Sequence, residues 1–147
     1  MLIADLDEEY INSILERENL QSIKPNLRFP GYVSNKDLAA LYGAAFVFLY
    51  PSIRESFGIP MLEAMACGTP IIAGNTSAMP EIAGEGAILV DPFSERSIAE
   101  KILQLEDDEQ LYNTQVAYGL ERVKLFSWQR SAEALLKIYE EVSGNNK

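Results

Sequence analysis

The stretch FVFLYPSIRESFGIPMLEAMACGTPIIA, residues 46–73, decides the fold of this 147-residue chain. It opens with an unbroken apolar and aromatic run, residues 46–50, which is typical of a strand covered on both faces of a sheet. A loop containing Gly58 follows, and Pro60 suits the first turn of a helix. A second apolar run, residues 71–73, comes soon after that helix. Strand, helix and strand in this order predict two parallel neighbours in a sheet.

The same alternation continues on both sides of this stretch. Residues 2–4, Leu27-Arg28-Phe29 and residues 88–90 also read as short strands, so we expect five strands in all. They should be parallel, because each connection carries a helix or a long loop. Polar residues that suit helix N-caps precede the helical patterns, and Gly119 is the weak point of one of them; the caps are Asp7, Ser34, Ser94 and Ser127.

These patterns predict an α/β fold with a Rossmann-like parallel sheet and helices on both faces. Hydrophobic residues make up 48% of the chain, which is enough for one core. We therefore expect residues 1–147 to form a single domain, whose C-terminal helices begin at about residue 95. The last of them should carry an apolar stripe that includes Trp128 and Tyr139.

The composition excludes several classes of function. A formal net charge of -10 argues against nucleic acid as a partner, because phosphate neutralisation needs clustered Lys and Arg. The chain has no histidine, which excludes a Ser–His–Asp triad and the commonest zinc sites. The single cysteine, Cys67, forms no internal disulfide, and no leader or membrane-spanning run is evident. Together these features predict a cytoplasmic location.

Glu55 and Glu63 are the carboxylates that lie around the predicted helix start. In open parallel sheets, ligands bind beyond the carboxyl ends of the strands. A helix N-terminus at that edge offers free N–H groups and a positive dipole end, which suit a phosphate. Both carboxylates would repel phosphate, so they are better placed to accept hydrogen bonds from hydroxyl groups on either side of a diphosphate.

This segment resembles the retaining GT-B-fold glycosyltransferases of the family 4 type, the glycosyl transferases group 1. Their hallmark is a pair of glutamates separated by seven residues, the EX7E motif, which Glu55 and Glu63 match. The flanking residues agree as well, which makes the match specific: Phe57-Gly58, Pro60, Ala64-Met65-Ala66-Cys67-Gly68-Thr69-Pro70, Gly31-Tyr32-Val33, Pro80-Glu81-Ile82, Val90-Asp91-Pro92 and Phe126-Ser127-Trp128. The resemblance covers the chain from about residue 27 onward.

The resemblance implies that this is the C-terminal, donor-binding half of such an enzyme, with a nucleotide diphosphate sugar of the UDP or GDP type as substrate. Glu55 would be the catalytic residue and lie against the donor sugar, and Glu63 would bind the ribose hydroxyls. The backbone near the helix start would contact the sugar and diphosphate, and an upstream loop would lie near the base; these residues are Ser56, Phe57, Gly58 and Ile59, then Gly31, Tyr32 and Val33. The family often has glycine where Ser56 stands. No metal and no other cofactor are expected.

The resemblance also implies that parts of a complete enzyme are absent. Family members have a preceding domain that binds a glycan or lipid acceptor, and they begin this domain with a strand-helix unit that supplies Arg and Lys for the diphosphate. We expect the chain to lack both, so that an open sheet edge is closed by direct strand pairing, by rearrangement of the N-terminal strand, or by a partner chain in a homo-oligomer. The complete enzyme could lie at the inner face of the membrane.

Two alternatives remain open. Asp5-Leu6-Asp7 follows the run at residues 2–4 and resembles the Asp-x-Asp of metal-dependent GT-A-type transferases, where Mn²⁺ or Mg²⁺ holds the diphosphate. That tripeptide is common, and Asp7 is explained as a helix cap. The second alternative is a non-catalytic module that binds nucleotide sugars or mediates oligomerisation.

Overall fold

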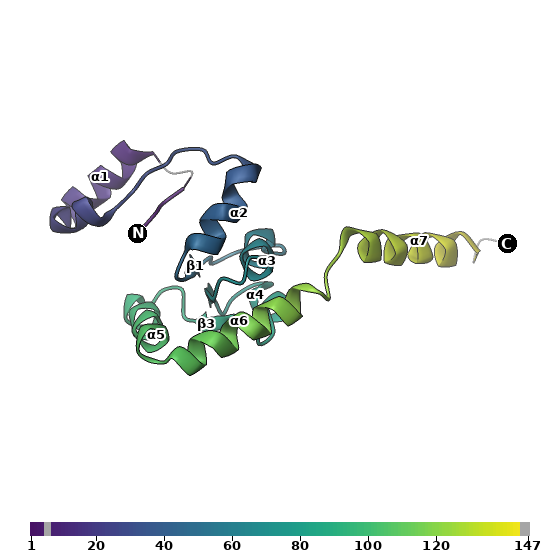
Figure 1. Cartoon of the computed structure of the whole chain (residues 1–147). Helices are drawn as coiled ribbons and strands as arrows, with labels where there is room; N and C mark the ends of the chain where they lie inside the picture. Colours follow the sequence, from purple (N-terminus) through teal and green to yellow (C-terminus); the bar gives the residue numbers. More distant parts are fainter. Residues whose placement is uncertain (5–6, 145–147) are drawn as a thin grey trace. The chain divides into compact units, whose positions relative to one another are not determined.

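The structure is a computed structural model that describes residues 1–4 and 7–144 (Figure 1). The chain divides into two compact units, Met1–Leu41 and Tyr42–Lys147, which are described separately. Asp5, the first residue of the Asp-x-Asp alternative, lies outside the described residues. Among the described helices, none combines the length and the apolar content that crossing a membrane requires.

The first unit contains α1 (Glu8–Arg17), the 3-10 helix η1 (Gln21–Asn26) and the start of α2 (Asn35–Ala44). Asp7 caps α1 as predicted, because its carboxylate accepts a hydrogen bond from the backbone N–H of Glu9. The hydrophobic side chains that this unit buries are those of Leu15 and Leu27. Its core is therefore small.

The two strands predicted in this unit are not formed. Residues 2–4 and 27–29 meet only in an isolated parallel bridge between Leu2 and Arg28. The bridge consists of two hydrogen bonds, from the N–H of Arg28 to the carbonyl of Met1 and from the N–H of Ile3 to the carbonyl of Arg28, both 2.9 Å. One bridge of this kind fixes too few residues to count as a strand, so the prediction of five strands was wrong.

The second unit holds a three-stranded sheet of β1 (Phe48–Tyr50), β2 (Ile71–Gly74) and β3 (Ile88–Val90). The strand order is β1-β2-β3 and both pairs are parallel, as expected. The central strand is fully buried, whereas every residue of β1 is only half-buried. The apolar run at residues 46–50 therefore forms a shorter and more exposed strand than its sequence predicts, because β1 pairs with β2 alone among the described residues.

Helices accompany the sheet on both sides (Figure 1): α3 (Ile59–Ala66), α4 (Met79–Ala83), α5 (Glu95–Asp107) and α6 (Glu109–Val123). The last helix along the chain is α7 (Trp128–Gly144). Ile72 of β2 and Val90 of β3 pack with Leu105 of α5 in one apolar cluster. Helix α6 packs closely against α3 and contacts α5. These contacts confirm the Rossmann-like α/β class.

Gly119 has a packing role that its sequence position does not reveal. The residue is buried in α6, and a β-carbon there would lie 3.3 Å from Cγ of Met65 in α3. The missing side chain lets the two helices approach each other. The glycine that the sequence pattern marks as a weak point of the helix therefore lies where α6 packs against α3.

Of the other predicted helix N-caps, two accept a hydrogen bond from the backbone of their helix and one makes a different bond. Ser94 and Ser127 act as caps, since their hydroxyl oxygens accept from the N–H groups of Ser97 and Arg130. The Ser34 hydroxyl donates instead to the Asp37 carboxylate at 2.7 Å. In α7 no described residue is buried, so its apolar stripe is exposed, as in Trp128 at 82%.

Candidate functional site

The loop between β1 and α3 turns at Gly58. This residue has φ 91° and ψ 47°, in the left-handed region that favours glycine. A β-carbon there would lie 3.2 Å from Sδ of Met79. The Gly58 carbonyl accepts the hydrogen bond of the Met61 N–H at 3.0 Å, which closes the first turn of α3. Glycine at this position thus allows the helix to begin directly above the end of β1.

The backbone at the start of α3 presents unused donors. The N–H groups of Phe57, Gly58 and Ile59 donate to no group within the described part of the chain. Pro60 follows them and has no N–H. Since the first N–H groups of a helix have no partner within it and lie at the positive end of its dipole, this turn can hold an anion.

Glu55 is half-buried, and two hydroxyl groups hold its carboxylate. The Tyr50 hydroxyl donates to Oε1 at 2.6 Å, and the Ser52 hydroxyl donates to the same oxygen at 3.2 Å. Burial of the Tyr50 phenol, and after it the hydrogen bond to Glu55, raises the pKa of Tyr50 well above its usual range. A phenol is protonated at neutral pH even without such a shift, so Tyr50 is a hydrogen-bond donor there, and the shift extends this role to more alkaline pH.

The backbone of Glu55 is hydrogen-bonded to the segment that follows β2. The Ser77 hydroxyl donates to the Glu55 carbonyl at 2.6 Å and accepts from the Glu55 N–H at 3.3 Å. Thr76 adds a hydrogen bond from its hydroxyl to the carbonyl of Ser52 at 3.1 Å. The segments after β1 and β2 therefore meet at the carboxyl edge of the sheet, where ligands of open parallel sheets bind.

Glu63 lies in α3 with its side chain exposed. The group beside it is the buried phenol of Tyr42; burial, and after it the charge of the Glu63 carboxylate, raises the pKa of Tyr42 to about 12. Phe48 lies between the two tyrosines, because its ring contacts Tyr42 edge-on at 5.1 Å and stacks on Tyr50 at 5.5 Å. Three aromatic rings thus connect the surroundings of the two glutamates.

Other predicted residues of this loop are exposed. Ser56 is exposed, and Phe57 and Ile59 are 41% and 44% exposed. The ring of Phe57 meets Phe126 edge-on at 5.8 Å. Glu55 thus lies in the loop before α3, and Glu63 lies about one turn inside that helix.

The predicted base-contacting loop belongs to the first unit. There, Gly31 has φ 67° and Tyr32 is 81% exposed, while Val33 is half-buried. A contact of these residues with a nucleotide base stays a prediction. Among residues 1–4 and 7–144, no group of three or more acidic or cysteine side chains could hold a metal ion.

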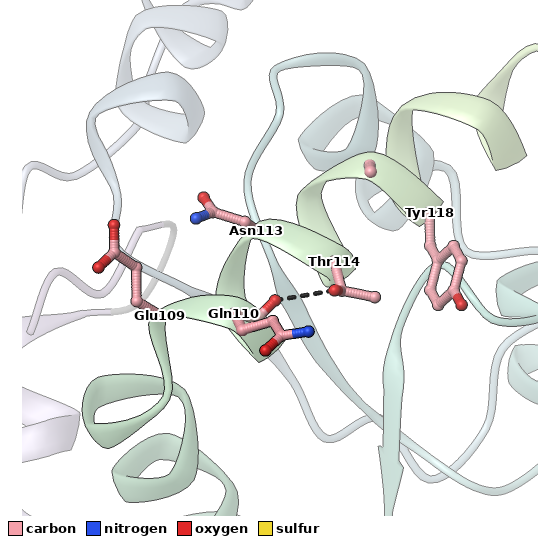
Figure 2. A pocket seen from close by; sticks show the side chains of 6 residues that line it. Glu109, Gln110, Asn113, Thr114 and Tyr118 are labelled. Carbon is pink, nitrogen blue, oxygen red and sulfur yellow. Dashed lines mark hydrogen bonds between the residues drawn. The ribbon is translucent and has the colours of Figure 1, made fainter.

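A separate open hollow lies along α6 (Figure 2), lined by Glu109, Gln110, Asn113, Thr114, Ala117 and Tyr118. All of these residues come from one helix, and the Thr114 hydroxyl donates to the carbonyl of Gln110 at 2.8 Å. The hollow includes neither glutamate of the motif. We regard it as relief on a helix surface, because its lining comes from one helix and the Thr114 hydroxyl is already bonded within that helix.

Sequence reasoning missed two residues of the site. The sequence pattern places Tyr50 in a strand and assigns no role to Ser77. Their positions after or at the carboxyl ends of parallel strands are the signal that could have indicated them. The partners themselves were not predictable, because the contact of Ser77 with Glu55 spans 22 residues of chain.

Comparisons with known proteins identify the family of the chain. The family model of the glycosyl transferases group 1 matches residues 2–122. The O-antigen chain mannosyltransferase B of Escherichia coli is 39% identical over 114 residues, which are 78% of this chain and 30% of that protein. The D-inositol 3-phosphate glycosyltransferase of Corynebacterium jeikeium (strain K411) is 37% identical over 135 residues, 86% of this chain and 32% of that protein. The chain thus spans about a third of the length of these relatives.

Solved structures show the same fold. The sucrose-phosphate synthase of Thermosynechococcus elongatus matches with a TM-score of 0.82 and 29% identity, over 99% of this chain and 39% of that one. HepE of Anabaena, in complex with UDP, matches with a TM-score of 0.74 and 23% identity, over 88% of this chain and 36% of that one. With the family model, these likenesses establish the GT-B-type Rossmann-like fold, and the chain belongs to the glycosyl transferases group 1.

Proposed function

We propose that this chain is the donor-binding domain of a retaining glycosyltransferase that transfers a hexose-type sugar from a nucleotide diphosphate to a glycan or lipid acceptor. The observation that carries the proposal is the start of α3. Three unused N–H groups, of Phe57, Gly58 and Ile59, lie there between the two glutamates of the motif. Donors flanked by acceptors match a diphosphate flanked by two sets of hydroxyl groups.

The parts of the donor have separate partners in this scheme. The diphosphate lies against the N–H groups and the positive end of the α3 dipole, which stabilise the charge of the leaving group. The exposed carboxylate of Glu63 accepts hydrogen bonds from the ribose hydroxyls, and Glu55 lies against the sugar as the catalytic carboxylate. Ser56 borders the sugar. The scheme uses no metal and no cofactor other than the nucleotide sugar.

A uridine or guanosine diphosphate is the proposed nucleotide, with Gly31, Tyr32 and Val33 near its base. Support for such a ligand comes from related folds, since HepE of Anabaena is described in complex with UDP and with UDP and glucose. The pneumococcal O-GlcNAc transferase GtfA, with a TM-score of 0.73, is described in complex with UDP and GlcNAc. These ligands belong to those proteins and only motivate the choice for this one.

The remaining partners lie beyond the described site. Because the chain spans about a third of its relatives, we place acceptor binding in residues outside it. The edge of β1 that faces away from β2 could pair with a second copy of the chain, which would make a homo-oligomer. We propose a cytoplasmic location, with the complete enzyme at the inner membrane face.

Ligand-observed saturation-transfer NMR on the purified chain tests the donor site. UDP, GDP, ADP, dTDP and their common sugar conjugates are compared for the wild type, for Glu63→Ala and for Glu106→Ala, an exposed glutamate of α5 that serves as the matched control. We expect selective transfer to one nucleotide that Glu63→Ala abolishes and Glu106→Ala preserves. No transfer from any nucleotide, or transfer that Glu63→Ala leaves intact, overturns the proposed site.

The same experiment separates the alternatives. Saturation transfer to a nucleotide that requires added Mn²⁺ and is lost in Asp5→Ala would favour the metal-dependent GT-A-type transferase. Binding that is independent of metal, without turnover when a separately supplied N-terminal half and an acceptor are present, would favour a non-catalytic nucleotide-sugar module. Turnover under those conditions would establish a transferase assembled from two parts.

A further inference from the structure

The carboxylate of Glu55 is held asymmetrically. Oε1 accepts both hydroxyl hydrogen bonds, from Tyr50 and from Ser52, whereas within the described residues Oε2 accepts none. The Tyr50 bond is the shorter of the two, at 2.6 Å against 3.2 Å. A hydroxyl-to-carboxylate bond of that length is a strong, charge-assisted one. One oxygen is therefore fixed and the other is left for a ligand.

Tyr50 is itself held rigidly at the end of β1. It lies in register with Ala73 of β2, and its ring stacks on Phe48 with an interplanar angle of 21°. A β-carbon at Gly58 would lie 3.7 Å from Cε1 of Tyr50, so the ring lies directly against the loop before α3. Because Tyr50 is fixed in β1, its hydrogen bond also fixes the Glu55 carboxylate relative to the sheet.

Ser77 holds the backbone of Glu55. Its hydroxyl makes two hydrogen bonds to the backbone of Glu55, and φ of Ser77 is 56°, in the region that non-glycine residues rarely occupy. With the backbone and Oε1 both held, the carboxylate of Glu55 loses most of its rotational freedom before a ligand arrives. Preorganisation of this kind lowers the entropic cost of binding.

We propose that Tyr50 is a positioning residue that aims the free oxygen of Glu55 at a hydroxyl group of the donor sugar, so that recognition of the sugar depends on Tyr50 while recognition of the nucleotide does not. This rests on the proposed function, in which Glu55 contacts the sugar and Glu63 the nucleotide. Tyr50 itself contacts Glu55 and not the donor. Loss of its hydroxyl should therefore separate the affinities for a nucleotide and for its sugar conjugate.

The test is Tyr50→Phe, measured by isothermal titration calorimetry with UDP and UDP-glucose, and with GDP and GDP-mannose. Phenylalanine keeps the ring and its stacking on Phe48 and removes only the hydroxyl. We expect the Kd of the sugar conjugate to rise about tenfold, from loss of a hydrogen bond to a charged group. The Kd of the free nucleotide should change less than about twofold.

Three controls sharpen this result. Tyr112→Phe removes a hydroxyl from another half-buried ring, which stacks on Phe46, and should change neither Kd. Ser52→Ala removes the longer bond to Oε1 and should have a smaller effect than Tyr50→Phe. In a Glu55→Ala background, Tyr50→Phe should have no further effect on the sugar conjugate, since the group that it positions is gone.

A readout without ligand keeps the positioning role separate from the proposed function. The ¹³C carboxyl resonance of Glu55, assigned by its loss in Glu55→Gln, should shift in Tyr50→Phe and not in Tyr112→Phe. If the wild type binds no nucleotide sugar but this resonance shifts, the proposed function fails and with it the role in sugar recognition, whereas the hold of Tyr50 on the Glu55 carboxylate stands. A resonance that does not move, or equal losses for nucleotide and sugar conjugate, overturns the inference about Tyr50.

Discussion

At the scale of single residues, Gly58 links the geometry of the loop to the stability of the chain. Its φ of 91° is unfavourable for any residue with a β-carbon, and that atom would lie 3.2 Å from Sδ of Met79. We predict that Gly58→Ala lowers the free energy of unfolding by about 1–3 kcal/mol, the range for a non-glycine residue held in a sparsely populated backbone region. Urea unfolding followed by circular dichroism measures this change.

Gly43 supplies the matched control for that substitution. It lies in α2, and the nearest atom to a β-carbon there would be the carbonyl oxygen of Cys67 at 4.0 Å. Gly43→Ala should therefore raise the free energy of unfolding, by about 0.5–1 kcal/mol, because alanine is the better helix former. Equal destabilisation by both substitutions would contradict the role assigned to Gly58.

The buried phenol of Tyr42 makes the stability depend on alkaline pH. Its pKa is raised to about 12 in the folded chain, above the value near 10 of an unfolded one. Below about pH 10 both states hold the proton. As the pH rises from there towards about 12, the unfolded state loses the proton first, so the free energy of unfolding falls.

Tyr42→Phe should reduce this fall, and Tyr50, whose pKa is also raised, should account for part of what is left. Urea unfolding at about pH 9 and about pH 11 gives the slope for the wild type and the variant. Tyr139→Phe, at an exposed position of α7, is the control. A slope that Tyr42→Phe and Tyr139→Phe leave equally unchanged would show that Tyr42 does not carry the effect.

The candidate site was only partly predictable at this scale. Glu55 and Glu63 could be identified from sequence because their significance lies in local spacing around one helix start. The residues that hold Glu55 could not be identified in this way. The role of the Ser77 hydroxyl depends on a contact between the segments that follow two different strands. Such a contact exists only after β1 and β2 have paired.

At the scale of elements, Arg122 of α6 fastens the end of α4. Its guanidinium donates to the carbonyls of Glu81 and Ile82, which belong to the last turn of α4 and have no partner within that short helix. The same group lies 5.2 Å from the centre of the Phe126 ring. The fork of an arginine can make these contacts together, whereas a lysine cannot.

We predict that Arg122→Lys lowers the free energy of unfolding by about 1–3 kcal/mol, because at least one carbonyl loses its donor in a partly buried position. Arg96→Lys is the control: Arg96 is exposed and forms an i,i+4 ion pair with Glu100, so its replacement should change stability by less than about 0.5 kcal/mol. Thermal and urea unfolding of both variants measure the difference. Similar small effects would mean that α4 does not depend on Arg122.

The elements themselves were predicted unevenly for a physical reason. The runs that became β2 and β3 lie in a sheet with helices packed on it, and burial supports their apolar pattern. The segments at residues 2–4 and 27–29, which were also predicted as strands, meet only at one bridge. Strand formation depends on neighbours, which a local pattern does not contain.

At the scale of the whole molecule, the chain's apolar burial is unequal. The first unit buries the hydrophobic side chains of Leu15 and Leu27, whereas the second contains the fully buried strand β2 and the cluster around Ile72, Val90 and Leu105. The composition predicts enough apolar residues for one core but not where they gather. The expectation of a single domain over residues 1–147 stays a prediction, which an equilibrium measurement can address.

Local stability follows local burial, so native-state hydrogen exchange should divide the chain between its two units. We predict that amides of α1 exchange with much lower protection than those of β2, by a factor of about 10² or more, since a difference of about 3 kcal/mol in opening free energy corresponds to that ratio. Mass spectrometry of peptides from the exchanged chain gives both values in one experiment. A destabilising substitution in the second unit, such as Arg122→Lys, should speed exchange in β2 and leave α1 unchanged. Equal protection of α1 and β2, falling together in the variant, would show that the chain unfolds as one cooperative domain.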